Sequence, residues 1–111
     1  MREIIFSHRF QKELDGAIKD SDHSPEEILE LLDIMIDYLS RGIPLPDYFN
    51  DHELEANWFG NRDAHLGPDL IVIYRLTEST ATFRRIGRHK TFFRTNWIWK
   101  KRMRAKRGRG I

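Results

Sequence analysis

The chain has 111 residues and a mass of 13.3 kDa, enough for one domain that buries roughly two-thirds of its unfolded surface and too little for two such cores. It contains no cysteine, so disulfides, thiolate metal sites and cysteine nucleophiles are excluded. No apolar run approaches the about 18 residues that span a bilayer, and the run after Glu3 is too short for a signal peptide. We therefore expect a single cytoplasmic domain, without secretion or membrane insertion.

The net charge of +2 hides a division between two parts of the chain. Residues 1–80 carry all seventeen acidic residues and seven basic ones, a net charge of −10, whereas residues 81–111 carry twelve basic residues and no acidic one. A basic terminus that only aids solubility, or that lies against the acidic part, would need no partner. Twelve uncompensated cations nevertheless favour a polyanion, because binding to nucleic acid releases condensed counterions.

The first half of the chain predicts a strand followed by two helices. The run 3–6 is a short apolar strand, and Ser7 stands as the N-cap of a helix whose apolar residues repeat at helical spacing. After a polar turn, Ser24-Pro25-Glu26-Glu27 forms a capping box before an apolar face that runs to Ser40. Gly42 then ends the second helix.

The second half of the chain predicts an antiparallel meander of three strands. A connector with two prolines, 43–46, cannot continue a helix. Two amphipathic helices need an apolar face, so the order β-α-α-β-β-β predicts an α+β two-layer domain, a helical hairpin packed on a small, mainly antiparallel twisted sheet. The predicted meander strands are 57–65, 70–76 and 81–87, joined by turns at 66–69 and 77–80.

Beyond an expected domain of residues 1–93, residues 94–111 form a basic C-terminal extension. Its Lys, Arg and Gly residues are typical of the basic arms that meet nucleic acid. A membrane-surface helix is disfavoured, because its apolar face would be short and two glycines weaken the helix.

Three histidines fall where the meander brings chain segments together. His52 lies in the loop before the meander, His65 ends its first strand beside Asp69, and His89 follows its third strand. Because the third strand runs antiparallel to the second, its end returns to the edge where the second began, which brings Arg85 and His89 toward His65. The topology alone thus predicts a cluster of histidines, a carboxylate and an arginine.

Such a cluster suits the cleavage of an RNA phosphodiester. One histidine acts as general base on the ribose 2′-hydroxyl, another protonates the departing 5′-oxygen, and an arginine stabilises the charge of the transition state. Histidine titrates near the working pH, Arg85 suits bidentate contact with phosphate, and Phe92 or Phe93 can stack on a base. For each histidine taken alone, a structural or surface role stays open.

A metal site is the chemical alternative. The conceivable ligands are His52, His65, His89 and Asp63 or Asp69. No pair of these residues has the short helical spacing of a metal motif, and Arg85, Arg88 and Lys90 would oppose a divalent cation. We therefore expect no metal and no other cofactor.

Several motifs, in their order and spacing, resemble the YafQ branch of the RelE toxin superfamily. These motifs are Leu45-Pro46-Asp47-Tyr48, Asp51-His52-Glu53-Leu54, residues 57–74 and residues 85–93. The resemblance covers roughly residues 3–93. It implies a RelE-like fold and the toxin of a bacterial type II toxin-antitoxin pair, a ribosome-dependent endoribonuclease that cuts messenger RNA in the ribosomal A site.

Transferred residue by residue, the resemblance also implies the site. Its catalytic residues are His52, His65, Asp69 and His89. Its phosphate-contacting arginine is Arg85, its substrate-side aromatic residue is Phe93, and Asp63 matches an acidic position of the same motif. The neighbouring cations Arg88 and Lys90 are expected on the substrate side as well. His89 is the favoured general acid, and the choice of base stays open. Leu70 stands where close relatives have a tryptophan, which we expect to weaken base stacking or to change codon preference.

The partners that the resemblance implies are a cognate antitoxin, the ribosome with its RNA, and messenger RNA. An acidic antitoxin segment would complement the basic half of the chain, and operator DNA would be reached only through the antitoxin. The alternative function is a non-catalytic ParE-like toxin, or a DNA-bound regulatory partner that binds without cleaving RNA. The retained histidines and aspartate argue against it, because a binder does not require them.

Overall fold

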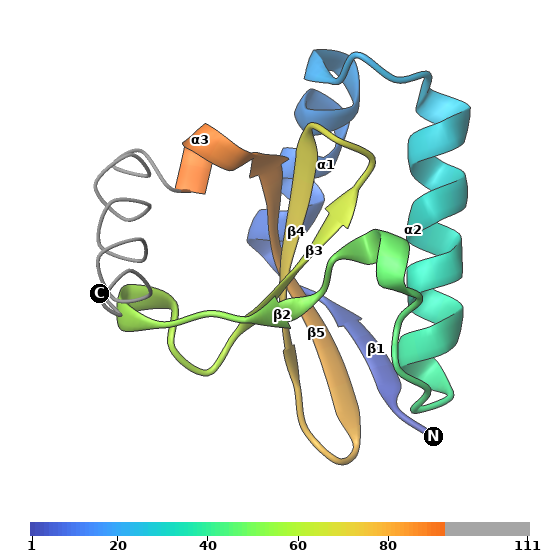
Figure 1. Ribbon diagram of the computed structural model, residues 1–111, viewed down its shortest axis with the longest axis vertical. Coiled ribbons are helices and arrows are strands. Elements are labelled where there is room, and N and C mark those ends of the chain that lie inside the picture. Colours follow the sequence, from blue (N-terminus) through green and yellow to red (C-terminus); the bar gives the residue numbers. More distant parts are fainter. Residues whose placement is uncertain (93–111) are drawn as a thin grey trace, which may run out of the picture.

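In the computed structural model, which describes residues 1–92, both long helices begin at the caps that the sequence predicts (Figure 1). Helix α1 (His8–Asp20) follows Ser7, whose hydroxyl accepts a hydrogen bond from an amide of the first turn at 3.0 Å. Helix α2 (Pro25–Ser40) follows Ser24, whose hydroxyl accepts from Glu27 N, while the Glu27 carboxylate accepts from Ser24 N, both at 3.2 Å. These bonds satisfy amides that a helix start otherwise leaves unpaired.

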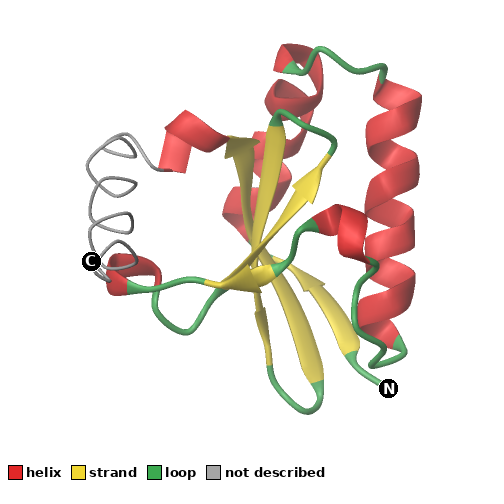
Figure 2. Ribbon diagram, in the orientation of Figure 1, coloured by secondary structure: helices red, strands yellow, loops and turns green. Residues whose placement is uncertain are grey.

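Five strands form one sheet in the order β1-β5-β4-β3-β2 (Figure 2). β1 runs parallel to β5, and the other neighbouring pairs are antiparallel. The three central strands make the predicted meander, so the α+β fold with a helical hairpin on a mainly antiparallel sheet is confirmed. The strands are β1 (Glu3–Phe6), β2 (His52–Glu53), β3 (Arg62–Leu66), β4 (Leu70–Leu76) and β5 (Thr80–Arg88).

The segment before the meander differs from the prediction. The predicted strand 57–65 was wrong in its first part, since a 3₁₀ turn occupies Ala56–Trp58 and β3 begins only at Arg62. The backbone explains this difference, because Ala56 (φ 56°) and Gly60 (φ 91°) adopt left-handed conformations that interrupt an extended run. Two short elements, β2 and α3 (His89–Phe92), were not predicted.

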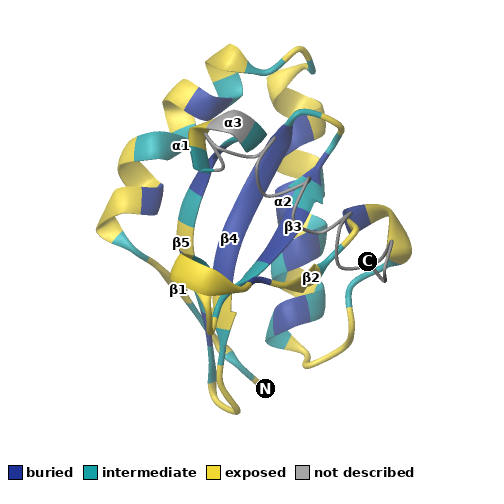
Figure 3. Cartoon of the chain, turned by 60° about the vertical axis from the view of Figure 1, so that its left-hand side comes forward, coloured by how far each residue is buried: buried dark blue, intermediate teal, exposed yellow. Residues whose placement is uncertain are grey.

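The main core lies between the helices and one face of the sheet, here called the helix face (Figure 3). Every fourth or third residue along α2 is buried, as its apolar pattern predicts. The buried residues of α2 are Ile28, Leu32, Met35 and Leu39, and those of β4 on the same face are Leu70, Val72 and Tyr74. Within the described residues, no helix is long and apolar enough to cross a membrane.

The opposite face of the sheet, here called the outer face, carries a second, smaller apolar cluster. Ile71 and Ile73 alternate with the core residues of β4 and therefore point to this face, where Leu54 is buried beside them. Trp58 and Phe92 pack against the same cluster. The 3₁₀ turn and α3 thus lie over the outer face, and they frame the region that holds the predicted site.

Candidate active site

A row of side chains crosses four strands on the outer face. The register pairs His52 with Asp63, Asp63 with Ile73, and Ile73 with Arg85. Because directly paired residues project to the same side of a sheet, these four side chains leave the outer face together. Three of the residues that the sequence predicts, His52, Asp63 and Arg85, therefore belong to one row.

The next row contains the second predicted histidine and leads to the third. The register pairs His65 with Ile71, and Ile71 with Gly87. His89 begins α3 two residues beyond Gly87. A Cβ at Gly87 would lie 3.2 Å from Phe92 Cζ, so the glycine lets this ring pack closely on the strand. The sheet thus brings His65 near the start of α3, as the meander predicts.

His52 and Asp63 face each other with an unusual proton requirement. His52 Nδ1 lies 2.8 Å from the Asn50 carbonyl oxygen, so Nδ1 carries a hydrogen. His52 Nε2 lies 3.3 Å from Asp63 Oδ1 in an ion-pair contact that lacks hydrogen-bond alignment, and this oxygen accepts no hydrogen bond within the described residues. With the hydrogen on Nδ1, Nε2 of a neutral ring is an acceptor, and so is an oxygen of an ionised carboxylate. The close contact is therefore favourable only where one of the two groups carries a further proton.

Asp63 is the buried partner of this pair. Its exposed fraction is 3%, and burial raises the pKa of its carboxyl above the ordinary range. The charges of His52 and His65 act in the opposite direction, whereas the nearby Asp51 adds to the rise in pKa. A buried carboxyl whose pKa is shifted by burial and by neighbouring charged groups is typical of functional sites.

The residues that directly precede His52 and Asp63 in the chain, Asp51 and Arg62, attach this segment to the helix face. Arg62 donates from Nε and Nη2 to the Asp51 carboxylate at 3.1 and 2.8 Å, and the Tyr74 hydroxyl donates to the same carboxylate. Burial and the bond to Asp51 both raise the pKa of Tyr74, so its hydroxyl stays protonated. Because β2 pairs through only two residues, this network adds anchoring contacts to the chain directly before His52.

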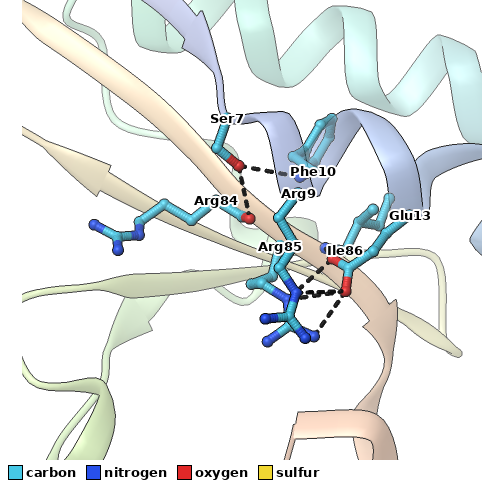
Figure 4. A network of polar contacts seen from close by, with 7 residues as sticks. All are labelled: Ser7, Arg9, Phe10, Glu13, Arg84, Arg85 and Ile86. Atoms are coloured by element: carbon cyan, nitrogen blue, oxygen red, sulfur yellow. Dashed lines mark hydrogen bonds and ion pairs between the residues drawn. The ribbon is translucent and has the colours of Figure 1, made fainter.

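Arg85 is held at the edge of β5 by α1 (Figure 4). Its Nε and Nη2 donate to Glu13 Oε2 at 2.9 and 2.7 Å, and Ile86 N donates to Glu13 Oε1 at 3.2 Å. Burial by itself would raise the pKa of Glu13, but these hydrogen bonds and the charge of Arg85 outweigh it and lower the pKa. The guanidinium also lies 4.9 Å from the centre of the Phe92 ring, in a cation–π contact.

Asp69 and Arg88 lie beside the turn between α1 and α2. The Asp69 carboxylate accepts hydrogen bonds from Ser21 Oγ at 3.2 Å and from Asp22 N at 2.8 Å. Arg88 Nη2 donates to the Asp20 carbonyl oxygen and lies 3.8 Å from both Asp22 and Asp69. These contacts tie the β3–β4 turn to the helices, and the structure does not bring the two side chains into the rows with His52 and His65.

The remaining predicted residues follow His89. Lys90 lies in α3, and Phe93 lies outside the described residues, as does the predicted extension 94–111. Side chains of residues 1–92 form no group of three His, Asp or Glu arranged to hold a metal ion. Asp51 and Arg62 were not predicted from the sequence, although each directly precedes a predicted site residue in the chain.

Comparison with known proteins identifies relatives over nearly the whole domain. A family model described as "Bacterial toxin of type II toxin-antitoxin system, YafQ" matches residues 2–94. The "mRNA interferase toxin YafQ" of Escherichia coli strain B / BL21-DE3 is 36% identical over 92 residues, which cover 83% of this chain and 96% of that protein.

Two solved structures of E. coli YafQ share the fold. The crystal structure of YafQ from strain BL21(DE3) has a TM-score of 0.69 at 35% identity and covers 84% of this chain and 99% of that one. The YafQ chain of the E. coli DinJ-YafQ complex has a TM-score of 0.67 at 36% identity, with the same coverage.

The family match over this fold, two helices on a mixed sheet, shows that the molecule is a toxin of the bacterial type II toxin-antitoxin class. Within that class the match is to one family, and it extends over most of the chain. The chain belongs to the YafQ toxin family, as its motifs suggest.

Proposed function

We propose that the protein is an mRNA interferase, an endoribonuclease that cuts messenger RNA in the A site of the ribosome, in the cytoplasm. Membership of the YafQ family supports the class of activity, because the E. coli relative is named an mRNA interferase toxin. The observation that carries the proposal is the row of His52, Asp63 and Arg85 beside His65 on one face of the sheet.

The reaction that these residues suit is an attack within the RNA itself. The ribose 2′-oxygen loses its proton to a base and attacks the neighbouring phosphorus. The bond from phosphorus to the 5′-oxygen breaks, and an acid delivers a proton to that oxygen. The products are a 2′,3′-cyclic phosphate and a 5′-hydroxyl end, so atoms and protons balance without a cofactor.

His65 is the better candidate for the base. Within residues 1–92 no hydrogen bond or ion pair engages its ring, whereas Asn50 and Asp63 face both ring nitrogens of His52. We accordingly propose that His52 positions the substrate and balances charge within the site. His89 is assigned the role of general acid, which follows from the family resemblance.

Arg85 is assigned the role of binding the scissile phosphate. Glu13 fixes its Nε and Nη2, and Nη1 makes no hydrogen bond within the described residues. A guanidinium held in this way is oriented before the substrate arrives, which favours stabilisation of the transition-state charge. Lys90 and Phe93 remain proposed contacts on the substrate side, whereas the contacts of Arg88 with the turn between α1 and α2 support a structural role.

Two further residues receive structural roles. The hydrogen bonds to Asp69 support a positioning role at the β3–β4 turn rather than that of a base. Leu70 is completely buried on the helix face, so this position has no surface on which a base could stack. Any stacking on RNA must then use other aromatic residues.

The proposal includes a cognate antitoxin as the partner that neutralises the toxin. The E. coli relative forms a complex with DinJ. The twelve basic residues of 81–111, with no acidic residue among them, would attract an acidic antitoxin segment. Operator DNA would be contacted only through that antitoxin.

The test is to map RNA 5′ ends after brief induction of the wild type, His65→Ala, His89→Ala and His8→Ala. His8 is an exposed histidine of the first turn of α1 and serves as the matched control. We expect cuts within translated codons for the wild type and His8→Ala, and their loss in the other two variants. Purified ribosomes should be required for the same cuts.

Growth arrest with intact messenger RNA would reject the proposal in favour of a non-catalytic toxin. Undiminished cutting by both His65→Ala and His89→Ala would reject the assigned site while leaving the nuclease activity in place. Circular dichroism of each purified variant establishes that a loss of cutting does not come from unfolding.

A further inference from the structure

Strand β5 contains a bulge at Arg84. Tyr74 pairs with Phe83, but the preceding residue of β4, Ile73, pairs with Arg85, so Arg84 is an extra residue without a partner in β4. A bulge changes the alternation of side chains and redirects those beside it. As a result, Phe83 and Ile86 both reach the core, and the two residues between them are arginines.

Helix α1 and the residue before it hold this bulge in place (Figure 4). Ser7 N donates to the Phe83 carbonyl oxygen and Ser7 Oγ donates to the Arg84 carbonyl oxygen, both at 2.9 Å. Beyond the bulge, Ile86 N donates to Glu13 at 3.2 Å. The backbone around Arg84 is therefore fixed, while Figure 4 shows the Arg84 side chain pointing away from α1.

A cavity of about 460 Å³ opens beside the bulge, within the range of roughly 300–1,000 Å³ typical of small-ligand sites. Its lining residues are Ser7, Arg9, Trp58, Thr82, Arg84 and Arg85. Three of them are arginines and none is acidic. The Arg84 guanidinium makes no hydrogen bond or ion pair within residues 1–92, and Arg9 and Arg85 share the single Glu13 carboxylate, at 3.6 and 2.7 Å.

The aromatic wall of the cavity is Trp58. Its indole meets the Phe92 ring edge to face at 6.0 Å between ring centres, and it packs against the apolar cluster of the outer face. The indole is thus supported from behind and half-buried, with part of its surface lining the cavity. A supported aromatic surface beside guanidinium groups is the combination that binds a base and its phosphate in single-stranded RNA.

We propose that this cavity binds the nucleotide of the RNA substrate that adjoins the one that is cut, with its phosphate on Arg84 and Arg9 and its base against Trp58. The inference rests on the proposed RNA cleavage. Arg85 connects the two sites, because it lines the cavity and also ends the row that begins at His52. A strand of RNA can therefore run from the scissile phosphate into the cavity along β5.

The first experiment measures binding without cleavage. The full-length protein, labelled with ¹⁵N, is titrated at low salt with a hexanucleotide whose riboses are 2′-O-methylated, so that no bond can break. We expect the indole N–H signal of Trp58 to shift on binding. This signal is identified as the one that is absent from the spectrum of Trp58→Phe. Arg84→Ala should raise the dissociation constant about tenfold and reduce the slope of log K against log salt by about one.

The matched control is Arg41→Ala, which removes the same charge from an exposed arginine that ends α2 in the helical layer. Arg9→Ala is the second test variant, in case Arg84→Ala alters the bulge. Binding by Arg41→Ala should equal that of the wild type. An unshifted Trp58 signal at saturation, or equal effects of Arg84→Ala, Arg9→Ala and Arg41→Ala, would overturn the proposal.

The second experiment separates this inference from the proposed function. The same variants are assayed for cleavage of messenger RNA on ribosomes, where Arg84→Ala should raise KM and leave kcat nearly unchanged.

If the wild type cuts RNA but Arg84→Ala and Arg41→Ala cut equally well, the cavity is not a substrate site and the nuclease proposal stands. If RNA shifts Trp58 and no message is cut, the cavity binds RNA and the nuclease proposal fails. A Trp58 shift caused by an acidic peptide but not by RNA would assign the cavity to a protein partner.

Discussion

At Asp63, burial and charge act on one carboxyl in opposite directions. Burial raises its pKa, and the histidines on either side, His52 and His65, oppose that rise. Nearby Asp51 also raises the pKa but is itself bound by Arg62. The folded protein therefore holds the Asp63 proton more tightly than the unfolded chain does, and this difference links stability to pH.

Asp63→Asn tests this linkage. Because the pKa is raised on folding, the stability that Asp63 contributes is complete below its unfolded pKa of about 3.9 and is lost as pH rises through the folded value. The free energy of unfolding of the wild type, minus that of Asp63→Asn, should fall as pH increases from about 4 toward 7. Urea unfolding of both proteins across this range measures the difference, in which the contribution of Glu13 cancels. A difference that grows with pH would contradict the assignment.

The Tyr74 hydroxyl provides a second test at the scale of one residue. Tyr74→Phe keeps the buried ring but removes a donor to Asp51, so we expect the free energy of unfolding to fall by about 1–2 kcal/mol. Cleavage should fall as well, because Asp51 directly precedes His52. Tyr48→Phe, at a ring that is 61% exposed, should change neither quantity. Equal effects of the two substitutions would show that the network does not position His52.

Among the elements, α3 depends on a close approach to β5. Gly87 lies under Phe92, where a Cβ would come within 3.2 Å of the ring. The first residue of this four-residue helix is His89, so a displaced ring would displace the proposed general acid. The position of α3 is thus set by one glycine and by the apolar cluster on the outer face.

Gly87→Ala should therefore lower kcat for messenger RNA cleavage by about tenfold or more, while the fold persists. Gly16→Ala is the matched control, because a Cβ there meets no atom within 4 Å and Gly16 lies inside α1. We expect the control to raise the free energy of unfolding by about 0.5–1 kcal/mol and to leave cleavage unchanged. Thermal unfolding and single-turnover cleavage of both variants measure the two effects. Unaltered cleavage by Gly87→Ala would show that the exact placement of α3 is not needed.

At the scale of the whole molecule, charge is the main asymmetry. Residues 94–111 carry eight basic residues and no acidic one, and all but the first of these residues lie beyond the family match, which ends at residue 94. We propose that they contact ribosomal RNA. A chain ending at Phe93 should bind ribosomes more weakly than the full chain and show a smaller dependence of binding on salt. Sedimentation with ribosomes over a range of salt concentrations tests this, and unchanged binding would reject the proposed role.

Much of the fold followed from local patterns in the sequence. The serine caps and the apolar face of α2 define the helices, because capping and helical periodicity depend on residues within a few positions of one another. The meander followed from β-branched runs and short turns, and it placed His65, Arg85 and His89 at one edge. The spacing of three between Phe83 and Ile86 breaks strand alternation and was also a signal of the bulge, which was not predicted.

By itself, then, the sequence determined the α+β architecture and the separation of charge, and it singled out three histidines as candidates. Each of these rests on residue type and short-range order. Only the tertiary structure decided which side chains meet. It placed His52 opposite Asp63 through a two-residue strand, turned Asp69 toward the helices, and gathered Arg9, Trp58 and Arg84 around one cavity. These contacts join residues far apart in the chain, and elements of two to four residues are too short to show a period, so packing and pairing had to select them.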